Sequence, residues 1–265
     1  MNNRTATQIT LKGKPYRFTQ PEVMGILNVT PDSFYAGSRK QTEAEIAQRT
    51  NEIIAEGATM IDVGACSTRP GSAPVGEEEE MSRLRNALKT VCREQPDAIL
   101  SIDTFRPKVA QMCVEEYGAD IINDVSEGSE EMFQTVGKLK VPYILMSVGA
   151  TLEDMETMFT ERIEMLKQAG ACDIILDPGY GFGKDIQQNF DILKQQERLL
   201  HFKMPLLVGI SRKRMIWQLL NITPAEALNG TTVVNALALL HGADILRVHD
   251  VKQAMETIKI IKACS

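Results

Sequence analysis

Side chains able to do chemistry recur in this sequence at the ends of short apolar runs. In residues 174–184 an apolar run stops at a carboxylate, Asp177, and a glycine-rich stretch then leads to Lys184. The polar groups that end comparable runs are Asn28, Asp103, Asn123, Asp124, Ser147, Ser211 and His249, and a further run over residues 60–62 leads to Ser67, Thr68 and Arg69. Eight such runs indicate a repeated unit that presents its chemistry at one end.

The elements that would position these groups are alternating strands and helices. Helical segments are expected between the runs, and this alternation predicts parallel strands joined by right-handed crossovers. Eight such units normally close into a (β/α)8, or TIM, barrel, which needs roughly 250 residues as one domain. The chain has 265 residues and 43% hydrophobic content, so we predict an α/β fold with a single barrel domain over residues 1–265.

Eight strands and an N-terminal hairpin are predicted. The strands are residues 23–27, 59–63, 98–102, 120–122, 141–146, 174–177, 205–210 and 244–248. Residues 8–18 alternate around Lys12, Gly13 and Lys14 as a β-hairpin does, and we expect this extension, residues 1–20, to cap the barrel floor. Residues 221–224 interrupt the helical stretch 215–240, so the seventh helix is predicted to be split or extended.

Composition narrows the classes of function. A net charge of −6 and a pI near 5.3 argue against nucleic-acid binding, which uses a basic face. No stretch reaches the roughly 18 apolar residues of a membrane span, and the polar N-terminus has no signal-like apolar segment. Five cysteines form no C-x-x-C pair, which suits free thiols in a reducing compartment. We therefore predict a cytoplasmic protein with small-molecule substrates and with no nucleic-acid or membrane partner.

The predicted rim of the barrel carries a mixed set of hydrogen-bonding groups. Loops at the C-terminal ends of barrel strands converge on one face, and active sites form there. Asp103, Asn123, Asp177 and Lys213 offer donors and acceptors that suit the edge of a flat, amide-rich heterocycle. Each residue alone also has a structural interpretation, such as a helix cap for Asp103 or Asn123. The hypothesis therefore depends on their convergence.

Other rim residues indicate an anion and a metal. Arg247 and His249 follow the last predicted strand just before a helix begins at Asp250, and the loops after the seventh and eighth strands are the usual phosphate site of such barrels. Asn28 adds an oxygen that suits Mg²⁺, which takes few protein ligands beside water and substrate phosphates. Residues 178–185 match neither G-x-G-x-x-G nor G-x-x-x-x-G-K-[ST], so these two nucleotide-binding motifs are excluded there.

Seven motifs stand out along the chain. They are Met24-Gly-Ile-Leu-Asn-Val-Thr-Pro-Asp-Ser-Phe34, Ser67-Thr-Arg-Pro-Gly71, Ser101-Ile-Asp-Thr104, Ile121-Ile-Asn-Asp124, Leu176-Asp-Pro-Gly-Tyr-Gly-Phe-Gly-Lys184, Ser211-Arg-Lys213 and Arg247-Val-His-Asp250. Together they resemble the motifs of the dihydropteroate synthase family. They occur in family order, and their combination is specific. The resemblance implies a Mg²⁺-dependent, dimeric transferase of folate synthesis with a pterin-binding TIM barrel. Such an enzyme joins 6-hydroxymethyl-7,8-dihydropterin diphosphate to p-aminobenzoate, giving 7,8-dihydropteroate and pyrophosphate.

The resemblance also implies roles for individual residues. The pterin-binding residues are Asp103, Asn123, Met146, Asp177, Phe182 and Lys213, and Asp177, Lys213 and Asp103 are the catalytic residues among them. The diphosphate-binding residues are Asn28, Arg247 and His249, with Asn28 also the metal ligand. The residues around the p-aminobenzoate and the closing loops are Ser67, Thr68, Arg69, Pro70 and Ser211. Loss of pyrophosphate from a methylene on an electron-rich pterin leaves a cation-like centre. An ionised Asp177 would stabilise that charge.

Three segments depart from the family pattern. Tyr35-Ala-Gly-Ser38 stands where the family commonly has Ser-Asp-Gly-Gly, Gly64-Ala-Cys66 where it often has Gly-Gly-Glu, and Met146-Ser147 where it usually has Met-His. The first change removes a loop carboxylate, at Ala36. A non-catalytic pterin-binding paralogue therefore stays open as an alternative.

Two other barrel enzymes are weaker alternatives. A methyltetrahydrofolate-dependent corrinoid methyltransferase shares the pterin-binding barrel, but it would have little use for a diphosphate clamp made by Arg247 and His249. A Schiff-base aldolase on the same fold would need its lysine inside a strand. Lys213 lies beyond the predicted seventh strand.

Overall fold

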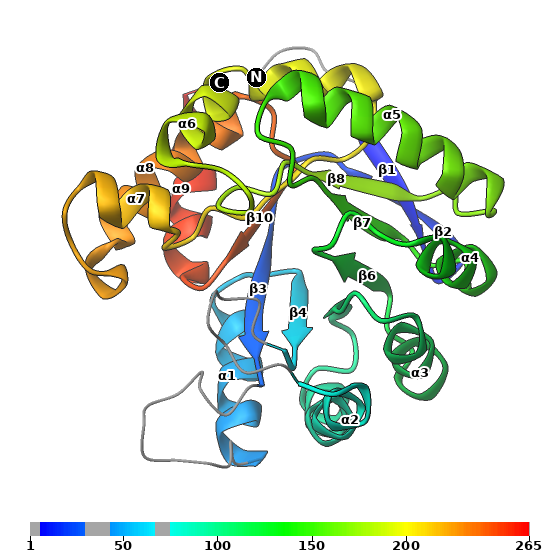
Figure 1. The fold of residues 1–265 in the computed structure, drawn as a ribbon. Helices are drawn as coiled ribbons and strands as arrows, with labels where there is room; N and C mark the ends of the chain where they lie inside the picture. Colours follow the sequence, from blue (N-terminus) through cyan, green and yellow to red (C-terminus); the bar gives the residue numbers. More distant parts are fainter. Residues whose placement is uncertain (1–5, 30–42, 67–74, 265) are drawn as a thin grey trace.

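A barrel of parallel strands surrounded by helices forms the core of the molecule (Figure 1). The computed structural model describes residues 6–29, 43–66 and 75–264. Their large sheet has the order β8-β7-β6-β5-β4-β3-β10-β9. The strands are β3 (Glu22–Asn28), β4 (Met60–Gly64), β5 (Ile99–Asp103), β6 (Ile121–Asp124), β7 (Tyr143–Met146), β8 (Ile174–Asp177), β9 (Leu207–Val208) and β10 (Ile245–Val248). A parallel bridge between Leu176 and Leu206 joins the two ends of this order. The predicted (β/α)8 barrel is confirmed.

The seventh strand differs most from its prediction. Residues 205–210 were expected to be extended, whereas β9 contains only Leu207 and Val208. Pro205 has no N–H to donate, and Gly209 has no side chain to pack, so both residues weaken strand pairing. The carbonyl of Pro205 still accepts a hydrogen bond from the N–H of Leu176 at 2.9 Å, which helps to close the barrel.

Helices cover the outside of the barrel. They are α1 (Glu43–Ala55), α2 (Glu77–Glu94), α3 (Pro107–Tyr117), α4 (Glu130–Leu139), α5 (Leu152–Gln168), α6 (Ile186–Lys194), α7 (Arg214–Leu219), α8 (Leu228–Leu240) and α9 (Val251–Ala263), with short 3-10 helices η1 (Gln196–Phe202) and η2 (Pro224–Glu226). Capping boxes begin α5 at Thr151 and α6 at Asp185. The predicted split of the seventh helix is confirmed, because η2 separates α7 from α8.

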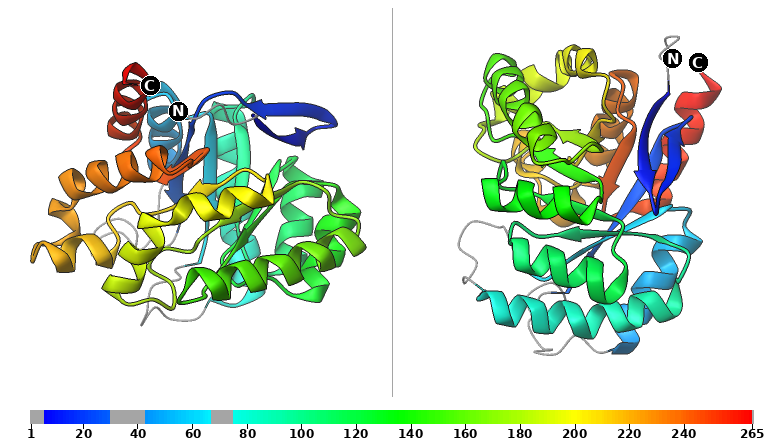
Figure 2. Two further views of the ribbon diagram at one scale, coloured as in Figure 1. Left: turned by 90° about the horizontal axis from the view of Figure 1, so that it is seen from above. Right: turned by 90° about the vertical axis from the view of Figure 1, so that its right-hand side faces the viewer.

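The N-terminal hairpin closes one end of the barrel, as Figure 2 shows. It consists of β1 (Thr7–Leu11) and β2 (Lys14–Phe18), paired antiparallel. The apolar side chains that meet there are Ile9, Leu11 and Phe18 from the hairpin and Met24, Met60, Ile121, Ile144, Ile175, Leu207 and Ile245 from the strands. The N–H of Thr10 also donates to Asp173 Oδ1 at 2.8 Å. The predicted cap on the floor is therefore confirmed.

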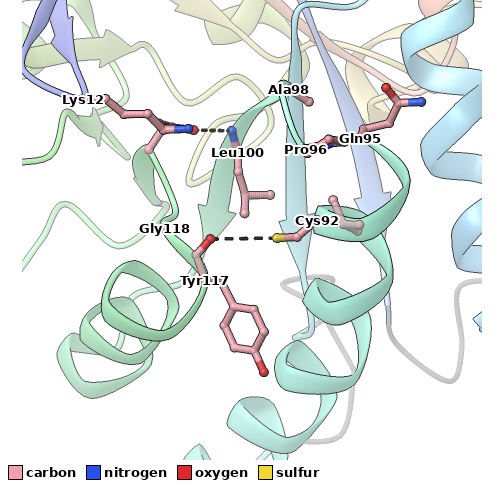
Figure 3. A pocket seen from close by; sticks show the side chains of 10 residues that line it. Lys12, Cys92, Gln95, Pro96, Ala98, Leu100, Tyr117 and Gly118 are labelled. Atoms are coloured by element: carbon pink, nitrogen blue, oxygen red, sulfur yellow. Dashed lines mark hydrogen bonds and ion pairs between the residues drawn. The ribbon is translucent and has the colours of Figure 1, made fainter.

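A small hollow lies beside this floor (Figure 3). Lys12 of the hairpin turn reaches Asp120 at 3.4 Å, and the Cys92 thiol lies 3.9 Å from the carbonyl oxygen of Tyr117. Leu100, near the start of β5, also lines it. The hollow therefore lies at the N-terminal ends of the strands, away from the converging rim residues.

In the described part of the chain, no helix combines the length and the apolar character that crossing a membrane requires.

Candidate active site

The inward positions of the strands become polar two residues beyond the floor. Side chains alternate along a strand, so residues two apart share a face. The paired positions, from floor to mouth, are Met60 and Asp62 on β4, Ile121 and Asn123 on β6, Ile175 and Asp177 on β8, and Ile245 and Arg247 on β10. The mouth of the barrel therefore collects charged and amide side chains that the fold partly or fully removes from water.

Asp177 and Lys213 form the centre of the predicted heterocycle edge. Asp177 is buried at the end of β8, and its Oδ1 accepts from the Gly179 N–H at 2.8 Å. Burial raises the pKa of Asp177, while the charge of Lys213 opposes this rise. Burial lowers the pKa of Lys213 to about 8, against the opposing effect of Asp177. The two groups therefore act on each other directly.

Two apolar side chains lie beside this pair. The Phe182 ring lies with its centroid 4.2 Å from Lys213 Nζ, a cation–π arrangement. Lys213 Nζ also donates to the carbonyl of Tyr180. Met146 is fully buried at the end of β7, in register with Asp177. The structure thus brings together four of the residues predicted to hold the heterocycle.

Arg247 connects the residues predicted to bind the heterocycle with the residues predicted to bind the anion. Its Nε donates to Asp62 Oδ2 and its Nη2 to Asp103 Oδ2, both at 2.7 Å. Burial alone would lower the pKa of Arg247, but the two carboxylates raise it above its usual value. Burial raises the pKa of Asp103 to about 7, with Arg247 opposing the rise. The two predicted groups are therefore one continuous network.

Asp62 is a site residue that the sequence analysis did not identify. It is fully buried, and it accepts hydrogen bonds from Ser101 Oγ at 2.6 Å, from Asn123 Nδ2 at 3.0 Å and from Arg247 Nε. A signal was present, because a lone carboxylate inside the apolar run Met60–Gly64 falls on the same face as the floor residue Met60. Such a group needs partners inside the barrel.

Asn28 and Asp103 converge at a glycine. Parallel register aligns Asn28 with Gly64 and Gly64 with Asp103. A Cβ at Gly64 would lie 3.3 Å from Asp103 Cβ and 3.5 Å from Asn28 Oδ1. The absence of a side chain at this position therefore lets an amide oxygen and a carboxylate approach the same space.

This pair of oxygen donors fits the predicted Mg²⁺. Mg²⁺ takes one or two protein oxygens and completes its shell with water and substrate phosphates. Among the described residues there is no cluster of three or more His, Cys, Asp or Glu suited to a metal ion. An ion at Asn28 would therefore depend on ligands from the substrate, which is the mode that Mg²⁺ favours.

Ser211 and His249 meet where the loops after β9 and β10 lie side by side, next to the strand β3 that carries Asn28. Ser211 Oγ lies 3.1 Å from His249 Nδ1 and accepts from the His249 N–H at 3.2 Å. The His249 carbonyl accepts from Arg49 Nη2 at 2.6 Å. The loops after β9 and β10 are thereby joined. A residue predicted for p-aminobenzoate lies next to one predicted for the diphosphate.

Lys184 fixes the glycine-rich loop. Its Nζ donates to the carbonyls of Ser147, Gly179 and Phe182 at 3.1, 2.9 and 3.0 Å. An ammonium group has three N–H donors, so these contacts use all of them. Burial lowers the pKa of Lys184 to about 8. Its position at the end of the motif therefore reflects loop structure.

Several predicted residues lie outside the described part of the chain. They are Ser67, Thr68, Arg69, Pro70 and Ala36. Two other departures from the family pattern are described. Cys66 Sγ lies 3.4 Å from Arg106 Nη1, and burial raises the pKa of this thiol to about 11. Ser147 is buried and its Oγ accepts from the Gly149 N–H at 3.0 Å.

Comparisons with known proteins show which family the chain resembles. The family model described as pterin binding enzyme matches residues 24–249. The dihydropteroate synthase of Escherichia coli K12 is 37% identical over 268 residues, which cover 95% of this chain and 94% of that protein. The Xanthomonas albilineans dihydropteroate synthase with 4-aminobenzoic acid superposes with a TM-score of 0.91 at 33% identity, covering 98% of both chains. The Coxiella burnetii dihydropteroate synthase in complex with pteroic acid gives 0.89 at 33% identity, covering 97% of this chain and 98% of that one.

These matches span nearly the whole chain. The chain therefore belongs to the pterin-binding enzymes and, among them, to the dihydropteroate synthase family.

Proposed function

We propose that this site condenses 6-hydroxymethyl-7,8-dihydropterin diphosphate with p-aminobenzoate, giving 7,8-dihydropteroate and pyrophosphate. The observation that carries the proposal is the buried network in which Arg247 links Asp103 and Asp62 and Asp62 links Arg247 to Asn123. One connected set of side chains thus offers acceptors for the pterin and a cation for the diphosphate. A methyltransferase that handles no diphosphate has no need of this arrangement.

The pterin would lie across Asp177, Asn123 and Lys213. The carboxylate of Asp177 accepts hydrogen bonds from the guanidine-like edge of the ring, and protonated Lys213 donates a hydrogen bond to the ring. Because the pKa of Lys213 is about 8, the amine is mostly protonated at neutral pH. Met146 and Phe182 border this edge with apolar surface.

The reaction replaces a carbon–oxygen bond by a carbon–nitrogen bond. The bond between the pterin methylene and the diphosphate oxygen breaks, and its electrons leave with pyrophosphate. The amine nitrogen of p-aminobenzoate bonds to the methylene and then loses a proton. Arg247 and His249 stabilise the leaving anion, and Asp177 stabilises positive charge that develops on the pterin. Catalysis therefore depends on electrostatic positioning more than on a strong base.

Asn28 and Asp103 would hold Mg²⁺ together with the diphosphate. The ion would neutralise charge on the phosphate oxygens and so favour departure of pyrophosphate. Gly64 keeps the space between the two side chains open. Titration with Mg²⁺ in the presence and absence of pyrophosphate tests this role, because binding without pyrophosphate should be much weaker.

A direct assay tests the activity. Purified protein is mixed with the pterin diphosphate, p-aminobenzoate and Mg²⁺, and dihydropteroate is measured by mass spectrometry. We expect product that depends on both substrates. Binding of both substrates without product would instead identify a non-catalytic pterin-binding paralogue.

We also propose that the protein is a homodimer that pairs through α7 and α8. Val233, Leu237 and Leu240 form one stripe along α8 and are 54%, 39% and 62% exposed. Leu219 and Leu220 extend the apolar surface at the end of α7. A second copy of the chain fits such a patch, since identical surfaces pair around a two-fold axis.

Oligomeric state tests the dimer. Light scattering coupled to gel filtration should give twice the 29.4 kDa chain mass, and Leu237→Glu should give the monomer. Gln111→Glu on α3, on the other side of the barrel in Figure 1, is the matched control. A monomeric wild-type protein would contradict the proposal.

We propose a cytoplasmic location as well. It is supported by the free thiols of Cys66, Cys92, Cys113, Cys172 and Cys264. Free thiols persist in reducing compartments.

A further inference from the structure

The Asn123 amide has one satisfied end and one unsatisfied end. Its Nδ2 donates to Asp62 Oδ2 at 3.0 Å. Its Oδ1 is buried and has no hydrogen-bond partner among the described residues. Asn123 as a whole is 1% exposed. A buried carbonyl oxygen without a partner costs free energy, so this oxygen is positioned for an N–H group that the ligand supplies.

Asp62 determines which end of the amide faces inward. An ionised carboxylate only accepts hydrogen bonds, so it selects the NH₂ end of Asn123 and turns the oxygen away. Arg247 Nε and Ser101 Oγ also donate to Asp62, at 2.7 and 2.6 Å, so both of its carboxylate oxygens act as acceptors. An amide in place of Asp62 would present an oxygen and an NH₂ group, so Asn123 could face it with either end.

We propose that Asp62 is a positioning residue that sets the hydrogen-bond polarity of Asn123 and thereby makes the site specific for a ligand N–H at that point. The inference rests on the proposed function in taking this ligand to be a pterin, whose edge carries several N–H groups. Asp62 itself touches no ligand. It acts through the orientation of one amide.

A reciprocal exchange of the two residues provides the test. Asp62→Asn removes the carboxylate that selects the NH₂ end of Asn123. It should weaken binding of 6-hydroxymethylpterin, a probe that lacks the diphosphate, by roughly tenfold. Asn123→Asp alone should weaken it more, since two carboxylates would then face each other. The double variant with both changes places the NH₂ group of residue 62 against one carboxylate oxygen of residue 123 and leaves the other oxygen toward the ligand. Asp62 Oδ2 also accepts from Arg247 Nε, and this second bond is lost in the double variant. The affinity of the double variant should therefore stay below wild type but exceed that of either single variant about threefold or more.

Asp124→Asn is the matched control. Asp124 is also a buried aspartate on β6, but its carboxylate accepts from Ser126 and from Tyr143. This change should alter stability and leave pterin affinity within about twofold. Calorimetric titration measures all four variants and the wild type, and thermal unfolding confirms that each is folded.

Steady-state kinetics separates positioning from general damage. Asp62→Asn should raise KM for the pterin diphosphate while KM for p-aminobenzoate stays within about twofold. Normal pterin affinity in Asp62→Asn, or a double variant no better than the single ones, would overturn the inference. A wild-type protein that binds the pterin but forms no dihydropteroate would contradict only the proposed function. The inference about Asp62 would still be tested, because the affinities of the exchange variants are measured without turnover.

Discussion

The floor and the mouth of the barrel use the same strands for opposite purposes. On each of four strands, moving two residues along the chain changes an apolar inward side chain into a polar one, as from Ile175 to Asp177. The floor is sealed by the hairpin and contains apolar groups, so its burial stabilises the fold. The mouth contains carboxylates and cations whose pKa values burial shifts. Stability and chemistry are therefore separated along the barrel axis.

Replacing an apolar side chain of the floor should give the largest effect, and this effect should be confined to stability. Phe18→Ala removes a side chain that is 4% exposed and packs against the strands. We expect a loss of about 3–5 kcal/mol in the free energy of unfolding, or roughly 10 °C in Tm, with kcat/KM nearly unchanged. Thermal unfolding and initial rates measure both quantities. Arg17→Ala, at the preceding exposed position, is the control, and equal losses in both variants would contradict the role of the floor.

Removing a charged group at the mouth should instead lower activity and leave stability nearly unchanged. Asp177→Asn removes the carboxylate charge while keeping the size of the side chain. A hydrogen bond to a charged group is worth roughly 1.5–3 kcal/mol, so kcat/KM should fall about tenfold to a hundredfold or more. Asp185→Asn, which caps α6 at the far end of the same loop, should keep its activity because asparagine caps a helix equally well. Near-normal turnover in Asp177→Asn would remove the basis for its catalytic role.

A buried carboxyl group at the mouth should also make the free energy of unfolding fall as pH rises. The pKa of Asp103 is about 7 in the folded chain, above its usual value of 3.8, chiefly because the group is buried. The folded state thus holds a proton between these values that the unfolded state has lost, so this contribution to stability is present below pH 3.8 and is lost as pH rises through 7. Urea unfolding of wild type and Asp103→Asn should show a difference in free energy that moves against wild type between about pH 4 and pH 7. A constant difference would contradict the raised pKa.

The rim between mouth and solvent should give the smallest effect. Ser211→Ala removes the hydroxyl that contacts His249. A neutral hydrogen bond contributes about 0.5–1.5 kcal/mol, so KM for the pterin diphosphate should rise roughly twofold to tenfold. Thr257→Ala removes a hydroxyl on α9, far from the rim, and should leave KM unchanged. Identical kinetic constants in the two variants would contradict a role for Ser211 in substrate binding.

Much of the architecture could be predicted because it depends on local pattern. Strands were placed to within about two residues, and residues at their C-terminal ends, such as Asp177 and Asn123, did fall on one face. That outcome follows from barrel geometry. The roles assigned to Ser67, Thr68, Arg69 and Pro70 stay predictions.

The partners inside the barrel could not be predicted. Arg247 and Asp62 are 185 residues apart in the sequence, and only the closure of the sheet brings them together. Alternation along β4 predicts which face Asp62 occupies but not what it meets. The pattern around Lys184 likewise gave no sign that three backbone carbonyls would surround its ammonium group.

The two lysines with a lowered pKa differ in a way that matters for covalent chemistry. Lys184 and Lys213 both have a pKa of about 8, so each is neutral, and hence nucleophilic, far more often than an ordinary lysine. Lys184 is 4% exposed and enclosed by carbonyl oxygens, which bars the approach of an electrophile. Lys213 lies at the start of α7 beside the Phe182 ring and is only partly buried. An acylating reagent shaped like a pterin would therefore modify Lys213 and spare Lys184.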